Sequence, residues 1–158
     1  MQKFSTVERA FHKIEKKMNS LLGPVRRAKL NNTDFTIISN NCWAGVCYEW
    51  FDMPKLSPTV GMYFFPDEYM NFLANLKDLI EMDFNVVSTH ESKYYKELDR
   101  RGQNNVLIGK LGDVEMTLLH YHDADVAKEK WKRRVSRINW NNMIYKFSYM
   151  NGCTDEHV

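Results

Sequence analysis

Residues 36–51, with the sequence TIISNNCWAGVCYEWF, decide the fold class of this chain. The β-branched run at their start predicts a buried strand, and the residues at their end have the composition of a short helix. In open α/β sheets, ligands commonly bind at the carboxyl ends of strands, and this stretch places side chains of varied chemistry at such an end. They are the amides of Asn40 and Asn41, the thiol of Cys42 and the indole of Trp43.

The rest of the chain continues the alternation of strand and helix patterns. Strands are expected at residues 34–39, 60–65, 84–89 and 143–149 and in a hairpin over 106–121, and helices at 4–22, 42–51, 66–82 and 123–138. Residues 90–105 are polar and fit either a helix or a mobile loop. The alternation predicts an α/β domain with a mixed, partly parallel sheet flanked by helices.

The start of the chain is expected to form an element of its own. Apolar residues recur there at the spacing of an amphipathic helix, and Gly23-Pro24 is expected to end it. These residues are Phe4, Val7, Phe11, Ile14, Met18 and Leu22. We expect residues 1–25 to form a peripheral N-terminal helix available to a protein partner, and residues 26–158 to form the α/β domain. Residues 154–156 have the pattern of a further helix start, so we expect this domain to be truncated at its C-terminal end.

Composition narrows the classes of protein and partner. The chain has 158 residues, 44% of them hydrophobic, which suits a single domain with its own core. The formal net charge of +2 does not favour a nucleic-acid partner. The three cysteines form an odd and sparse set, which is typical of a reducing compartment, so we expect a cytoplasmic protein. No apolar run approaches the roughly 20 residues needed to span a bilayer, so no transmembrane segment is expected.

Cys42 is a candidate nucleophile. A thiol near a helix N-terminus has its thiolate stabilised by the helix dipole, and a nearby histidine would lower the thiol pKa further. Cys42, with His120 as base and Asp123 as orienting acid, would form such a catalytic group. The alternative is that Cys42 is a small buried side chain, because cysteine is among the most buried residue types. Asn40 and Asn41 also have two interpretations, as helix caps or as ligand contacts.

Two further strand ends carry candidate side chains. In the turn LSPTVG, Ser57 and Thr59 present hydroxyl groups, and His120 and Tyr121 lie at the end of the hairpin. His120 is a candidate proton carrier because histidine titrates near neutral pH. His122 falls on the same expected strand face as His120. A third ligand at a diagnostic spacing is missing, so we expect no metal site.

The helix at residues 123–138 carries an arginine in its apolar stripe, which consists of Ala127, Trp131 and Ile138. At about 100° per residue, Arg134 projects within about 20° of the centre of that stripe. A buried guanidinium stays charged and needs an anion or several carbonyl groups. Arg134 therefore either pairs with an acid of a neighbouring element or, with Arg137 beside it, binds a phosphate or carboxylate of a ligand. Asp123 is expected to cap the start of this helix.

Several stretches in the same order resemble one bacterial protein family. They are DFTIISNNCWAG (34–45), LSPTVGMYFFPDEYMNFLANL (56–76), LLHYHDADVAKEKWKRRVSRINWNN (118–142) and NGCT (151–154). Over about residues 26–158 the chain is similar to domain-of-unknown-function family 1919. The matching positions are Asn40, Asn41, Cys42, Trp43, Gly45, Ser57, Pro58, Thr59, Gly61, His120, Tyr121, Trp131, Arg134, Arg137 and Asn139. The chain departs from the family pattern at Ala44, where a second glycine is expected, and at His122, where lysine is common.

The resemblance implies a protein of capsule, exopolysaccharide or lipopolysaccharide gene clusters, in which some members are named as acetyltransferases. We therefore expect a transferase of surface-polysaccharide biosynthesis that moves an acyl group, most specifically acetyl, to a sugar. His120 would be the general base, Asn40 and Asn41 would stabilise an oxyanion, and Trp43 would stack on the sugar ring. The remaining expected substrate contacts are Ser57, Thr59, Tyr121, Arg134 and Arg137. Acetyl-CoA would be the donor, although the chain shows no known acyl-CoA motif.

Two alternatives remain open from the sequence. A glycosyltransferase would bind a nucleotide sugar, and a metal-dependent one would use an Asp-x-Asp, which is matched here only by Asp123-Ala124-Asp125. That tripeptide stands at a helix start, where capping explains it equally well. A non-catalytic sugar- or protein-binding module would use the same polar side chains without a base, and its N-terminal helix would dock a protein partner.

Overall fold

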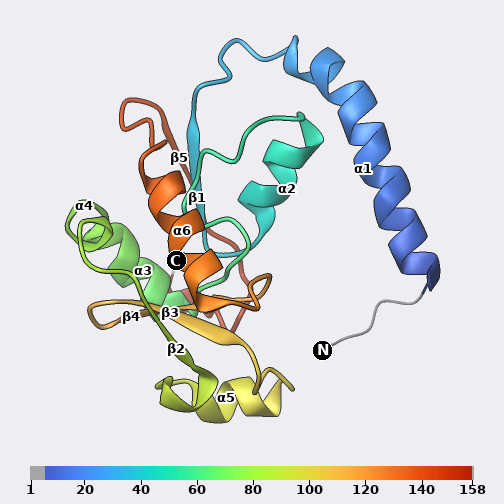
Figure 1. Ribbon diagram of the computed structural model, residues 1–158. Helices are drawn as coiled ribbons and strands as arrows, with labels where there is room; N and C mark the ends of the chain where they lie inside the picture. The colour runs from blue at the N-terminus through green and yellow to red at the C-terminus, as the bar shows by residue number, and fades with distance from the viewer. Residues whose placement is uncertain (1–5, 158) are drawn as a thin grey trace.

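The computed structural model describes residues 6–157. Figure 1 shows the two small sheets and the helices around them. The helices are α1 (Thr6–Arg27), α2 (Trp43–Trp50), α3 (Pro66–Ala74), α4 (Leu76–Ile80), α5 (Tyr95–Arg100) and α6 (Ala124–Val135). The strands are β1 (Thr36–Ser39), β2 (Asn85–Ser88), β3 (Leu107–Leu111), β4 (Val114–Leu118) and β5 (Met143–Lys146). Short 3-10 turns lie at Thr89–Glu91 and Asp155–His157, the latter where a further helix start was expected.

The expected α/β class is confirmed, with the strands divided between two sheets. β1 and β5 pair in parallel, from Thr36 opposite Met143 to Ser39 opposite Lys146. β2, β3 and β4 form an antiparallel sheet in that order, and the expected hairpin is its β3–β4 pair. Gly112 makes the hairpin turn with a φ of 56°, a backbone conformation that glycine adopts without strain. The parallel pair brings the carboxyl ends of β1 and β5 together at one edge.

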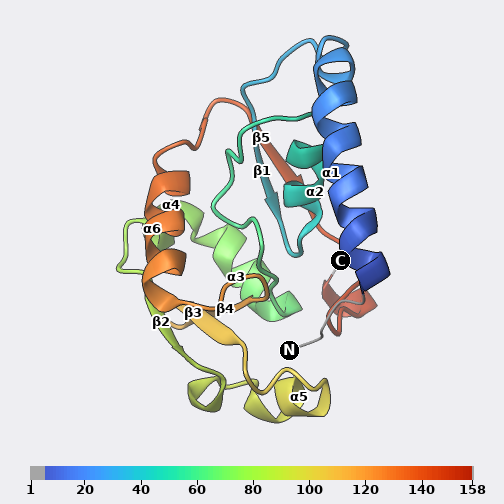
Figure 2. The ribbon, with the colours of Figure 1, turned by 45° about the vertical axis from the view of Figure 1, so that its right-hand side comes forward.

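β1 is buried on both faces because its side chains alternate between two hydrophobic clusters. Ile38 packs in the larger cluster with residues of α3 and α6, including Tyr69 and Trp131, and Ile37 packs in a smaller cluster with Tyr48 of α2. Figure 2 shows the resulting layers, with α2 on one side of the β1–β5 pair and α6 and α3 on the other. This double burial explains the continuous apolar character of the strand.

Two expected elements differ in detail. The strand expected at residues 60–65 makes only a single bridge, Tyr63 with Thr117, because its backbone groups bond to several different segments. Phe64 donates to the Asn40 carbonyl at 3.1 Å, while the Gly61 carbonyl accepts from His120. The helix expected at residues 66–82 is divided into α3 and α4 at Asn75, whose side-chain amide competes for the carbonyl of Asn71 at 3.1 Å.

The expected end of the N-terminal helix at Gly23-Pro24 is wrong, since α1 continues to Arg27. Contacts of the last turn with the end of α2 offset the missing proline N–H. The Arg26 guanidinium lies 3.4 Å from the ring centroid of Trp50, and Arg27 donates to the Asp52 carbonyl. Phe4 and the side chain of Val7, both used in the helix prediction, lie outside the described residues. None of the helices described in residues 6–157 is long and apolar enough to cross a membrane.

Candidate functional site

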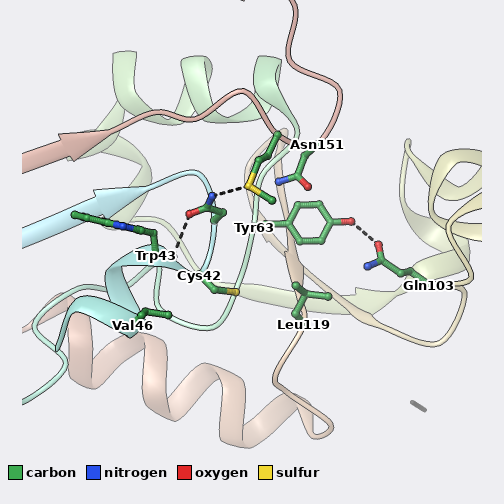
Figure 3. A pocket seen from close by; sticks show the side chains of 9 residues that line it. Cys42, Trp43, Val46, Tyr63, Gln103, Leu119 and Asn151 are labelled. Carbon is green, nitrogen blue, oxygen red and sulfur yellow. Dashed lines mark hydrogen bonds between the residues drawn. The ribbon is translucent and has the colours of Figure 1, made fainter. Parts of the chain in front are cut away.

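A cavity of about 350 Å³ opens at the carboxyl ends of β1 and β5 (Figure 3). Its walls come from segments far apart in the sequence: the start of α2, the Tyr63 bridge, the residues after α5 and after β4, and the turn that follows β5. The lining residues are Asn41, Cys42, Trp43, Val46, Tyr63, Gln103, Leu119, Met150 and Asn151. The site thus lies where an α/β topology places ligands, and the sequence predicted Asn41, Cys42 and Trp43 there.

Aromatic rings and amides dominate the cavity. In Figure 3 the ring of Tyr63 lies between Trp43 and Gln103, and its hydroxyl points to Gln103. That hydroxyl donates to the Gln103 side-chain oxygen at 2.6 Å, which fixes both side chains. Trp43 is 42% exposed, and the Lys146 ammonium lies 5.6 Å from its ring centroid. The site therefore offers the exposed ring face of Trp43, amide donors and acceptors, and the cations Lys146 near Trp43 and Arg101 near Tyr63.

The neighbouring amides Asn40 and Asn41 have different contacts. Asn40 is fully buried, and its side chain makes three hydrogen bonds to Ser148: Nδ2 to the carbonyl at 2.9 Å, and Oδ1 from the amide N–H at 3.1 Å and from Oγ at 3.0 Å. Asn41 lines the cavity, and its Oδ1 accepts from the Trp43 backbone N–H at 3.0 Å, which closes a turn directly before α2, whose N-cap residue is Cys42. Asn40 thus joins the ends of two strands, and Asn41 both holds the turn before α2 and faces the cavity.

The thiol of Cys42 lines the cavity. Burial raises the pKa of the Cys42 thiol above its ordinary value, which disfavours the thiolate despite the helix start. Its hydrogen-bond partner in the described part of the chain is the Met62 carbonyl at 3.8 Å, and burial, with no contribution from His120, accounts for the shift of its pKa. The arrangement matches the interpretation of Cys42 as a small packed side chain more closely than that of an activated nucleophile.

His120 lies beside the cavity and does not line it. β4 ends at Leu118, so His120 and His122 do not share a strand face as expected, and both are exposed. Among residues 6–157, no group of three or more histidine, cysteine or acidic side chains is placed to hold a metal ion. Asp123 accepts from the Val126 N–H at 2.8 Å, so the expected cap of α6 is confirmed.

Ser57 and Thr59 lie in a buried turn behind β1. The Ser57 hydroxyl contacts the Thr59 hydroxyl at 3.1 Å and accepts from the Thr59 N–H at 3.2 Å. The Thr59 hydroxyl also accepts from the Ser39 N–H at 3.4 Å. Both side chains hold the turn against the edge of β1, and neither lines the cavity.

Arg134 is buried as expected, with 7% of its surface exposed, and its partners are neutral. Its Nη1 donates to the Val60 carbonyl at 2.8 Å and also to the Tyr121 hydroxyl, which itself donates to Val60 at 2.8 Å. Burial raises the pKa of Tyr121, and the arginine opposes this rise. Of the alternatives left open by the sequence, an acid of a neighbouring element does not pair with Arg134 in the described residues, and a carbonyl and a hydroxyl oxygen hold its guanidinium. Arg137 is exposed, and none of these side chains lines the cavity.

Six lining residues were not predicted: Val46, Tyr63, Gln103, Leu119, Met150 and Asn151. They come from five separate segments and form no local motif, so their proximity depends on tertiary folding. Asn151-Gly152 carried a weak signal as a turn dipeptide, and both residues have positive φ, 62° and 92°. The other five gave no sign in the sequence of facing a shared cavity.

Comparison of the sequence with protein families assigns the chain to one of them. The family described as "Domain of unknown function (DUF1919)" matches residues 12–158, and the chain belongs to this family. The match begins within α1, earlier than residue 26, where the resemblance described above starts. The chain is also similar to an "Uncharacterized protein" of Haemophilus influenzae (strain ATCC 51907 / DSM 11121 / KW20 / Rd), with 26% identity over 145 residues. The alignment covers 92% of this chain and 64% of the relative, so the chain spans less than two thirds of that relative's length.

Proposed function

We propose that the cavity binds a sugar, and that the chain acts in the biosynthesis of bacterial surface polysaccharide. The observation that carries this proposal is the exposed ring of Trp43 beside three amides, Asn41, Gln103 and Asn151, around one opening, whose wall includes the edge of the buried ring of Tyr63. Aromatic faces pack on the apolar faces of sugar rings, and amides exchange hydrogen bonds with hydroxyl groups in both directions. A volume of about 350 Å³ lies within the range of small-ligand sites.

The proposed reaction is transfer of an acyl group to a hydroxyl of the bound sugar in the cytoplasm, with acetyl-CoA as the donor. This part rests on the resemblance described above. His120 remains the proposed base, and its place next to Leu119 of the cavity wall supports the assignment. The Lys146 ammonium beside Trp43 is a candidate contact for a phosphate of the donor or of a carrier.

A non-catalytic sugar-binding module is the second candidate. It is favoured by the absence of any carboxylate or imidazole among the cavity-lining side chains in the described part of the chain. Cys42 does not fill that role because burial favours its protonated thiol. A glycosyltransferase using a nucleotide sugar is a third possibility, with less support, because Asp123 serves as a helix cap.

Sugar binding is tested by comparing Trp43→Ala with Trp140→Ala. The two tryptophans are 42% and 41% exposed and each lies near a lysine, but Trp140 precedes β5 and so lies at the opposite end of the parallel pair from Trp43. The chain is screened against an array of bacterial oligosaccharides, and hits are measured by saturation-transfer NMR. We expect Trp43→Ala to weaken binding at least about 10-fold and Trp140→Ala to leave it unchanged. No binding by the parent chain, or equal losses in both variants, would refute the site.

The reaction class is tested with the sugar found in that screen. Release of CoA thiol from acetyl-CoA supports acyl transfer, release of UDP from UDP-sugars supports glycosyl transfer, and binding without either product supports the module. His120→Ala is expected to abolish acyl transfer and retain sugar binding. Full transfer activity in this variant would remove His120 as the base.

A further inference from the structure

The apolar stripe of α1 faces solvent. Its centre consists of five side chains that are between 51% and 68% exposed: Phe11, Ile14, Met18, Leu21 and Val25. Leu22, used above in the helix prediction, lies at the flank of the stripe and is 43% exposed. An amphipathic helix on a globular domain usually turns this side to the core, because burial of apolar surface provides most of its stability. In α1 the stripe has no partner among the described residues of the chain.

The opposite side of α1 holds the helix to the rest of the protein. Gly23 is buried against the end of α2, where an added Cβ would lie 2.3 Å from the Cβ of Asp52. Arg26 and Arg27 contact Trp50 and the Asp52 carbonyl. At about 100° per residue, Gly23 points about 160° away from the centre of the apolar stripe. Figures 1 and 2 show α1 along the outer edge of the molecule, with its C-terminal end continuing into the loop that leads to β1. Because the opposite side of α1 is the one that packs on α2, the apolar stripe points away from the rest of the protein.

The spacing of the stripe is that of a coiled-coil seam. Its five residues follow one another at intervals of three, four, three and four, and the sequence continues the pattern backwards at Val7 and Phe4. Alternating intervals of three and four produce a strict seven-residue repeat, in which these residues occupy the a and d positions. A helix that packs on a globular core shows a broader and less regular stripe. We propose that α1 forms a parallel two-stranded coiled coil with α1 of a second copy of this chain.

The charges beside the seam favour a parallel pair of identical helices. With Met18 at an a position, Glu15 falls at e and Lys17 at g. In a parallel pair, e positions face g positions, so Glu15 lies beside the partner's Ala10 and Lys17 beside the partner's Leu22. The aliphatic stem of the lysine can then cover the leucine. In an antiparallel pair, e faces e and g faces g, which brings Glu15 near Glu15 and Lys17 near Lys17, and these contacts are repulsive.

The docking of α1 leaves room for this partner. Gly23 stands at an f position, the one farthest from the seam, so each globular domain would lie on the outside of its own helix. A twofold axis parallel to the helices then places the two domains on opposite sides of the coiled coil. The pair uses the same surface of both copies, so it closes as a dimer.

Sedimentation equilibrium of the full chain tests the proposal, with Met18→Glu compared with Met70→Glu. Met18 is 51% exposed in the seam, and Met70 is 46% exposed on α3. We expect the parent chain and Met70→Glu to sediment at twice the 18.8 kDa of one chain. We expect Met18→Glu to raise the dissociation constant at least about 100-fold, because each dimer would bury two carboxylates. Circular dichroism checks that both variants are folded. A monomeric parent chain, a three-chain mass, or equal behaviour of the two variants would overturn the proposal.

Cross-linking tests the orientation. In Phe11→Cys, a parallel pair brings the two introduced thiols together, and a short bismaleimide joins them, while the parent chain controls for the native cysteines. Lack of a specific cross-link would overturn the parallel arrangement. A lipid surface is the competing partner for an amphipathic helix that carries lysines. Binding of a monomeric chain to phosphatidylglycerol vesicles, lost in Met18→Glu, would replace the dimer as the explanation. The proposal does not depend on the function assigned to the cavity.

Discussion

Substitutions of the adjacent residues Asn40 and Asn41 test whether one of these amides stabilises the fold while the other contacts the ligand. We expect Asn40→Ala to lower the free energy of unfolding by about 3 kcal/mol. The substitution removes three side-chain hydrogen bonds to Ser148, each with a net contribution of about 0.5–1.5 kcal/mol, from a fully buried position. Asn41→Ala removes a hydrogen bond to the Trp43 N–H and a contact with the Ser148 hydroxyl, and we expect a loss of about 1 kcal/mol.

Urea denaturation monitored by circular dichroism measures both losses. The midpoint of the Asn40→Ala transition should fall with an unchanged m-value, since the extent of unfolding stays the same. Ser148→Ala serves as a control, because it removes the hydroxyl contacts and keeps both backbone hydrogen bonds to Asn40. Sugar binding should survive in folded Asn40→Ala and weaken in Asn41→Ala, since only Asn41 lines the cavity. A loss below about 1 kcal/mol for Asn40→Ala, or reduced sugar affinity in its folded state, would refute this reasoning.

Two further predictions concern packing and the thiol. Gly109→Ala should lower the free energy of unfolding, measured by urea denaturation, by about 1–3 kcal/mol. The added Cβ would lie 2.5 Å from the ring of Phe84, which stacks on Trp131. An unchanged denaturation midpoint would show that the Phe84 ring moves freely. Alkylation of Cys42 by iodoacetamide, followed by peptide mass spectrometry, should be slower at pH 7.5 in the folded chain than in guanidinium. Its rate should also rise at higher pH than in the unfolded chain, since burial raises the thiol pKa and the folded state retains the proton. Faster reaction in the folded chain at pH 7.5 would contradict the assigned burial.

Local sequence signals predicted the elements that local chemistry determines. The β-branched residues before Ser39 and the helix pattern after Cys42 gave β1 and α2, and Gly112 gave the β3–β4 turn. The stripe arithmetic also placed Arg134 among buried side chains. In each case the residues that determine the local structure lie close together in the sequence, so their preference for a strand, helix or turn does not depend on a distant part of the chain.

Features that depend on distant contacts were not predictable from one sequence. The carboxyl end of β1 is completed by Ser148, which lies 108 positions from Asn40, and no spacing rule connects them. The same holds for the cavity, whose wall joins Tyr63 to Gln103 across 40 positions. The end of α1 was misplaced for a related reason: proline disfavours a helix locally, and the contact of Arg26 with Trp50 stabilises the last turn from outside.

The placement of His120 makes the proposed sugar binding and the proposed acyl transfer separable by mutation. Its neighbour Leu119 lines the cavity, while His120 is exposed, and its backbone N–H bonds to Gly61 at 3.3 Å. Loss of Trp43 should therefore reduce sugar affinity whether or not the chain is an enzyme, and loss of His120 should reduce only turnover. If each of the two substitutions reduced both affinity and turnover, His120 would have to contact the bound sugar. The turn after β4 would then have to rearrange when the sugar binds.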